Sequence, residues 1–264
     1  MNISFLRHFS AIALCLCTAS AYATEAPSRT ECIAPAKPGG GFDLTCKLLQ
    51  VSLMETGAIK KPMRVTYMPG GVGAVAYNAI VAQRPGEPGT VVAFSGGSLL
   101  NLSQGKFGRY GVDDVRWLAS VGTDYGMIAV RTDSPWKDLA SFMAAMEKNP
   151  ASIVIGAGAS IGSQDWMKAA LLAQKANVPT AKEQGYDLVW PIIRGFFVGP
   201  KVSDVDYQWW VEEFSKLQQT DAFKKQRELR GLFEFNVNGK ELDAYVKKQV
   251  EDYRQQAKAF GLAK

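Results

Sequence analysis

The sequence has 264 residues, of which 47% are hydrophobic and 21% are charged, and this composition excludes a disordered or collagen-like polymer. The formal net charge is +5. Because this excess of basic residues is small and not clustered, we expect no nucleic-acid partner.

The first 23 residues have the pattern of a secretory signal. Arg7 supplies a positive charge, residues 9–18 are mostly apolar, and Ala21-Tyr22-Ala23 is a small-x-small cleavage site. We predict cleavage after Ala23 and release of a soluble protein into the periplasm. The only histidine, His8, lies in this segment. The mature chain would therefore lack the side chain that most often serves triads and general acid–base steps, and we expect a non-enzymatic protein without metal or cofactor.

Two cysteines remain in the mature chain, Cys32 and Cys46. In an exported protein an even number of cysteines favours a disulfide over a metal site or a nucleophile. We therefore predict that these two residues are bonded to each other.

The middle of the chain alternates predicted helices and strands. Helices are predicted at 43–55, 74–83, 136–147 and around 166–171, and extended segments at 63–68, 90–94, 115–121, 127–131 and 152–155, with a weaker one at 188–190. Such alternation indicates an α/β architecture with largely parallel sheets.

The last third begins with an apolar strand at 192–198 and continues with helices. A helix starting at Ser203 carries Trp209, Trp210, Phe214 and Leu217. In the final helix Asn238 and Glu241 have the spacing of a capping box. Its apolar stripe, which we expect to face the core, consists of Leu242, Tyr245, Val246, Val250, Tyr253 and Phe260.

The chain has four glycine-rich turns, at residues 39–43, 70–73, 95–98 and 156–163, and all except the third lead into predicted helices. Parallel sheets gather such turns at the carboxyl ends of their strands. The N–H groups at a helix start carry partial positive charge and can hold an anion without lysine or arginine. Asp43, inside the first turn, would either cap its helix or orient water or ligand.

A dinucleotide site is the main competing interpretation. Gly71-x-Gly73-x-x-Ala76 follows a predicted strand and opens a helix, as the nucleotide fingerprint requires. The next strand, however, ends in Ser95 rather than in an acidic residue that would bind the ribose. The fingerprint is therefore incomplete.

Several segments of the chain together resemble the substrate-binding proteins of tripartite tricarboxylate transporters, also called the Bug type. The resemblance extends over nearly all of the mature chain and rests on residues 36–44 (AKPGGGFDL), 68–73 (MPGGVG), 88–90 (PGT), 156–162 (GAGASIG) and 178–185 (VPTAKEQG). The cysteine pair around the first turn is similar to that of the citrate-binding branch.

The resemblance implies a two-lobed, type II periplasmic-binding-protein fold that closes on a small carboxylate. Residues 24–123 with 193–264 would form the first lobe, and 124–192 the second. Family members carry several dozen more residues before the motif at Val178, so we expect the second lobe to be shortened.

The resemblance also implies how the ligand is held. Backbone amides, hydroxyls and ordered water of one loop in each lobe, at 39–43 and 158–163 here, would bind the carboxylate. With the serine turn of the first lobe added, the candidate binding residues are Gly39, Gly40, Gly41, Phe42, Asp43, Ser95, Gly96, Ser98, Gly158, Ser160, Gly162 and Ser163.

The predicted function is capture of a di- or tricarboxylate such as citrate by a monomer. The protein would deliver this carboxylate to a tripartite tricarboxylate transporter that has a large and a small membrane subunit. The alternatives are a periplasmic sensor that signals to a membrane kinase and a nucleotide-binding enzyme.

Overall fold

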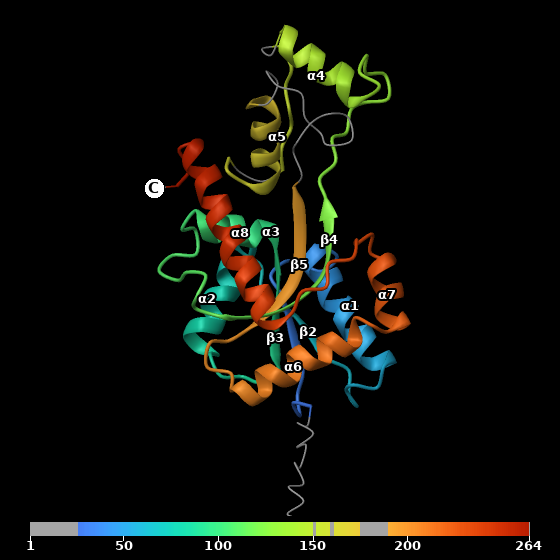
Figure 1. Ribbon diagram of the computed structural model, residues 1–264, viewed down its shortest axis with the longest axis vertical. Coiled ribbons are helices and arrows are strands. Elements are labelled where there is room, and N and C mark those ends of the chain that lie inside the picture. The colour runs from blue at the N-terminus through green and yellow to red at the C-terminus, as the bar shows by residue number, and fades with distance from the viewer. Residues whose placement is uncertain (1–25, 150–151, 159–160, 175–189, 264) are drawn as a thin grey trace, which may run out of the picture.

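The structure is a computed structural model that describes residues 26–149, 152–158, 161–174 and 190–263 (Figure 1). The predicted signal, the candidate Ser160 and most of the predicted segment 188–190 lie outside these ranges. Trp190, the one described residue of that segment, is not part of a strand.

The described residues form one five-stranded sheet. Its strands are β1 (Glu31–Ala34), β2 (Arg64–Tyr67), β3 (Thr90–Ser95), β4 (Arg116–Tyr125) and β5 (Pro191–Val198), in the order β2-β1-β3-β5-β4. β1 is parallel to β2 and β3, whereas β5 is antiparallel to β3 and β4. The prediction of a largely parallel sheet is therefore wrong for β5. The chain leaves the sheet at the carboxyl end of β4 and re-enters it beside that point, so β5 must run antiparallel to β4.

Helices cover both faces of the sheet. One face packs against α1 (Gly41–Glu55), α6 (Asp204–Leu217) and α7 (Asp221–Glu228). The other face packs against α2 (Ala74–Gln83), α3 (Gly96–Ser103) and α8 (Gly239–Ala259), with the short 3₁₀ turn Gly71–Gly73 before α2. The mixed α/β class that the sequence predicts is confirmed.

Most predicted core residues are buried. The stripe of α8 packs on the sheet, as do Trp209, Trp210, Phe214 and Leu217 of α6. The capping box at Asn238 is not formed, because the Asn238 amide exchanges hydrogen bonds with Gln218 instead of capping α8. The helices α3 and α7 were not predicted from the sequence.

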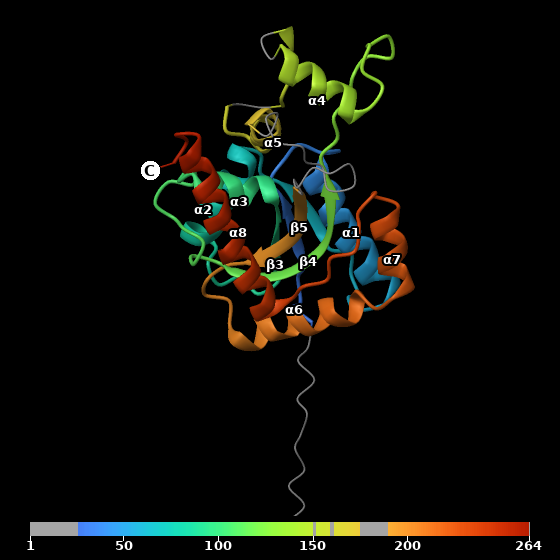
Figure 2. The same cartoon turned by 45° about the horizontal axis from the view of Figure 1, so that its top comes forward.

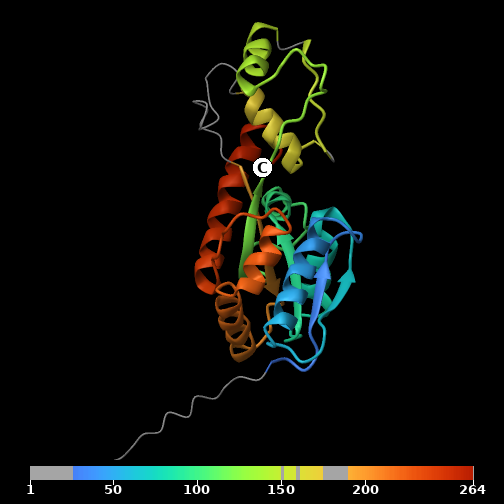
Figure 3. The same ribbon diagram turned by 90° about the vertical axis from the view of Figure 1, so that its right-hand side faces the viewer.

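The described residues between β4 and β5, within 126–190, form a second part of the molecule that we call the insertion. It contains α4 (Leu139–Lys148) and α5 (Gln164–Gln174) and stands beyond the end of the sheet where β4 ends and β5 begins (Figures 1 and 3). The strands predicted at 127–131 and 152–155 are wrong, since no strand occurs among the described residues of the insertion. Met127 and Val154 are both 94% exposed, so no neighbouring strand or core covers these segments.

The helix α5 connects the insertion to the sheet. Met167 and Leu171 pack into the core between the sheet and α8, while Leu172 packs with the buried side chains of α4. Trp166 contacts Phe260 edge to face. One helix therefore contributes to two separate apolar clusters.

Candidate functional site

Three of the four glycine turns lie at one edge of the sheet. The turns at 39–43, 70–73 and 95–98 follow β1, β2 and β3, which are parallel neighbours, so their carboxyl ends lie side by side. Figure 2 brings this edge, below α5, toward the viewer. The topology thus gathers most of the predicted anion-binding backbone, as parallel strands require.

The turn before α1 is open to solvent. Gly39 and Gly41 are exposed and Gly40 is partly exposed. The N-cap residue, Gly40, has no side chain to satisfy the first N–H groups of α1. This turn therefore presents backbone donors and the positive end of a 15-residue helix at the surface.

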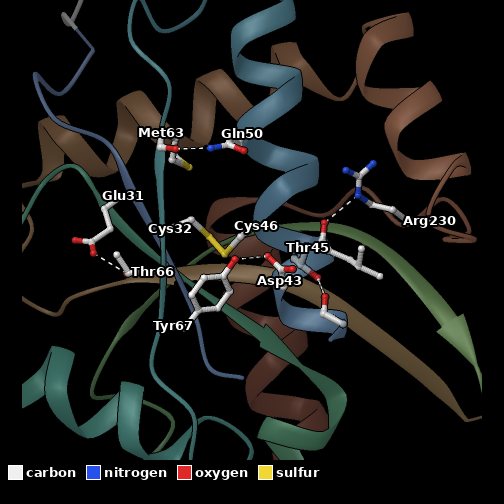
Figure 4. Close-up of a disulfide and its surroundings, with 12 residues drawn as sticks. Glu31, Cys32, Asp43, Thr45, Cys46, Gln50, Met63, Thr66, Tyr67 and Arg230 are labelled. Carbon is white, nitrogen blue, oxygen red and sulfur yellow. Dashed lines mark hydrogen bonds between the residues drawn. A yellow bond between two sulfur atoms is a disulfide. The ribbon is translucent and has the colours of Figure 1, made fainter. Parts of the chain in front are cut away.

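Asp43 holds this turn from inside the helix. Its carboxylate is fully buried and accepts hydrogen bonds from the Gly39 N–H (2.7 Å), the Lys47 ammonium (2.8 Å) and the Tyr67 hydroxyl (2.9 Å; Figure 4). Burial raises the pKa of Asp43, but the bonds from Lys47, Gly39 and Tyr67 outweigh burial and lower it below its ordinary value of 3.8. Of the two predicted roles, the structure favours the structural one, because both oxygens are bonded within the protein.

The predicted disulfide between Cys32 and Cys46 is confirmed (Figure 4). It joins β1 to α1 across the glycine turn, with 5.7 Å between the two Cα atoms. Both cysteines are buried in the core. The turn is therefore fixed by a covalent bond on one side and by Asp43 on the other.

The turn after β3 is buried. Ser95 and Ser98 are nearly inaccessible, and the Ser98 hydroxyl accepts a hydrogen bond from the Ser95 N–H (3.3 Å). The amide of Gln164, the first residue of α5, lies 3.0 Å from the position that a Cβ on Gly96 would occupy. Ser95, Gly96 and Ser98 thus lie together at the predicted edge, and α5 covers Gly96.

The described residues of the 158–163 loop contact the start of α5 and the end of α3. Ser163 donates to the Gly158 carbonyl (2.7 Å) and accepts from the Trp166 N–H (3.2 Å). The Gly162 carbonyl accepts a hydrogen bond from Gln104, directly after α3 (2.9 Å). Among the described residues no hydrogen bond joins this loop to the Gly39 turn.

An ion pair that the sequence patterns did not predict lies beside the open turn. The Arg194 guanidinium, on β5, donates to the Asp124 carboxylate at the end of β4 (Nη2 to Oδ2, 2.8 Å). The sequence feature that points to this ion pair is a single charged residue, Arg194, inside the apolar run 191–198. A lone charge in such a run indicates a polar contact that periodicity alone does not reveal.

Within the residues that the structure describes, no group of three or more histidine, cysteine, aspartate or glutamate side chains is placed to hold a metal. None of the described helices combines the length and the apolar character needed to cross a bilayer.

Comparisons with known proteins identify the fold. No family model matches the sequence, and no curated protein matches it. Solved structures do match. The periplasmic binding protein BugD superposes with a TM-score of 0.72 at 16% identity, covering 90% of this chain and 99% of that one.

Two matching structures hold dicarboxylates. MatC from Rhodopseudomonas palustris with bound malate has a TM-score of 0.68 at 15% identity, over 87% of this chain and 99% of MatC. An R. palustris protein with adipate has a TM-score of 0.69 at 12% identity, over 89% of this chain and 98% of that one. The chain shares their fold. At these identities the likeness extends to the fold and not to the ligand.

Proposed function

We propose that this chain is an exported, non-enzymatic solute-binding protein that captures a small di- or tricarboxylate. The observation that carries the proposal is the exposed start of α1, where no side chain caps the first N–H groups of the helix and where Asp43 and a disulfide fix the preceding turn. A rigid set of donors at a helix start suits a carboxylate. The sequence motifs of the Bug type and the malate and adipate in proteins of the same fold support this ligand class.

The finer parts of the proposal concern location and partners. The signal pattern at residues 1–23 supports export to the periplasm, and N-terminal sequencing of the secreted protein should begin at Thr24. We expect a monomer that passes its ligand to the large and small membrane subunits of a tripartite tricarboxylate transporter. Co-purification of those subunits with a ligand-loaded, tagged chain tests this partner, whereas co-purification of a membrane kinase would favour the sensor alternative.

The ligand is tested by thermal unfolding of the mature chain with citrate, malate and adipate at millimolar concentrations. A ligand that binds only the folded state stabilises it by about 2.7 kcal/mol at 100 times its Kd, so the unfolding temperature should rise with concentration. Calorimetric titration then gives the Kd, and the acid should be recovered chemically unchanged. The absence of any shift with all three acids would contradict the proposal.

A further inference from the structure

Arg194 occupies an unusual place in an apolar strand. In β5 it is the only charged residue, and all seven other residues of Pro191–Val198 are apolar or glycine. Its side chain is 17% exposed, so part of the group reaches solvent although the strand lies inside the sheet. In the pairing of β3 with β5, Arg194 lies opposite Ser95, at the carboxyl end of β3. The strand therefore places one cation at the edge where the glycine turns meet.

The Arg194 guanidinium lies directly against the first turn of α1. A Cβ built on Gly41 would be 2.7 Å from Nη1 and 3.2 Å from both Cζ and Nη2 of Arg194. These similar distances show that the group approaches the Gly41 backbone closely, and only glycine leaves room for it. Gly41 itself is exposed. The cation and the open backbone donors of α1 thus form one continuous surface.

The charges around this contact favour an anion. A cation beside a helix N-terminus is unfavourable, because the helix carries about half a positive charge there. Asp124 bonds the Arg194 guanidinium, and Asp43 is bonded to Lys47. The two carboxylates therefore each have a cationic partner, and neither caps the first N–H groups of α1, because Asp43 accepts from the Gly39 N–H that precedes the helix. A carboxylate that contacts both these N–H groups and Arg194 would offset the positive charge there.

We infer that Arg194 is the side-chain cation of the carboxylate site and determines the affinity of that site for acids. This inference rests on the proposed function and extends it, because backbone donors alone would make binding insensitive to Arg194. Asp124 is a positioning residue that holds the guanidinium over Gly41. The guanidinium suits this role because its planar set of donors matches a carboxylate.

The decisive experiment is titration of wild type and Arg194→Gln with citrate, malate and adipate at two salt concentrations. Arg194→Gln should weaken the acid that binds by about 10- to 100-fold, the range expected for loss of a charge-assisted hydrogen bond. Its affinity should also depend less on salt than that of wild type, because one cation is missing. Arg194→Lys should recover part of the affinity, since it restores the charge without the planar fork.

The matched control is Arg116→Gln. Arg116 lies at the opposite end of the β4–β5 pair, is also mostly buried, and also forms a 2.8 Å ion pair, with Asp204. This variant changes the net charge by the same amount, so it should bind the acid within twofold of wild type. Its unfolding curve shows what loss of a buried arginine does to stability.

A second variant, Gly41→Ala, tests whether the position of the Arg194 guanidinium matters for binding, because it leaves the arginine itself unchanged. In Gly41→Ala the new methyl group would displace the end of the flexible Arg194 side chain, while the helical backbone accepts alanine. Affinity should fall, and the fall should be much smaller when Gly41→Ala is made in the Arg194→Gln background.

The outcomes separate the two proposals. If wild type binds an acid and both Arg194→Gln and Gly41→Ala bind it within twofold, the role of Arg194 is wrong and the proposed function stands. Equal losses in Arg194→Gln and Arg116→Gln would also overturn the role of Arg194, because the effect would then be one of net charge. If wild type binds none of the acids, the proposed function fails and this inference with it.

Discussion

The sheet with its flanking helices and the insertion differ in how much of their apolar surface they bury. Both faces of the sheet are covered, and the two core clusters include eight residues of β3 and β5 that are almost inaccessible. The described residues of the insertion contribute one small cluster of their own, built from Phe142, Met143 and Met146 of α4 with Leu172 of α5. Because stability grows with the apolar area that leaves water, the fold is held mainly by the sheet, and the insertion is held through α5.

The largest effect is expected in the centre of the sheet. Phe196→Ala removes a fully buried ring that stacks on Phe214 of α6, and should lower the free energy of unfolding by about 3 to 5 kcal/mol. Urea denaturation followed by circular dichroism measures this loss. A loss below about 1 kcal/mol would show that the sheet is less tightly packed than its burial indicates.

The second-largest loss of stability is expected when the disulfide is removed. The Cys32→Ser, Cys46→Ser double variant opens a loop whose ends are 14 residues apart, and should lose about 3 kcal/mol. It should also bind its acid more weakly, because the disulfide holds β1 and α1 on either side of the Gly39 turn. Reduced wild-type protein provides the comparison without substitution, and unchanged affinity in both would show that the turn does not need this bond.

A smaller effect is expected at Asp43, together with a dependence on pH. Asp43→Asn weakens three hydrogen bonds and should cost about 2 kcal/mol near neutral pH. Since the pKa of Asp43 is lowered on folding, its stabilisation is complete above the unfolded value of about 3.9 and is lost as the pH falls through the lower folded value. The difference in unfolding temperature between wild type and Asp43→Asn should therefore be constant above about pH 5 and shrink below about pH 4. A difference that does not change with pH would exclude the charge as its cause.

The smallest effect on overall stability is expected in α4. Met143 is as fully buried as Phe196, and in a large core its replacement by alanine would cost about 2 to 5 kcal/mol. In the small cluster of α4 we expect less than about 1 kcal/mol in urea unfolding of the sheet, because this cluster can open locally. Hydrogen exchange of residues 139–148 should increase while exchange in β1 and β3 stays the same. A full loss in urea unfolding would show that the two parts unfold as one.

Periodicity in the sequence predicted the sheet better than the insertion. Four of the five strands of the sheet, β2 to β5, coincide with predicted extended segments, because their apolar runs have a core to face, whereas β1 was not predicted. The segments 127–131 and 152–155 have similar β-rich composition but no partner strand among the described residues, and a strand forms only where neighbours complete its hydrogen bonds. The helix α3 was missed because its first residues, Gly96 and Gly97, are typical of turns.

The sequence predicted where the backbone turns of the candidate site lie, but not which side chains surround them. Glycine turns after strands indicated the three turns at one edge, since parallel strands end on the same side. The burial of Ser95 and Ser98 depends on α5, which is distant in sequence. The approach of Arg194 to Gly41 likewise joins residues more than 150 positions apart, and no local pattern contains that information.

Two adjacent leucines on α5 restrict how the insertion can move. Leu171 packs with the α8 side of the sheet and Leu172 with α4, so these two neighbours on one helix are anchored in different places. A swing of the whole insertion would have to withdraw Leu171 and Met167 from their pockets, whereas a motion confined to α4 would separate only the contacts of Leu172. Moving α4 alone therefore breaks fewer apolar contacts than moving the whole insertion. We predict that α4 can change its tilt relative to α5 while α5 stays packed on the sheet.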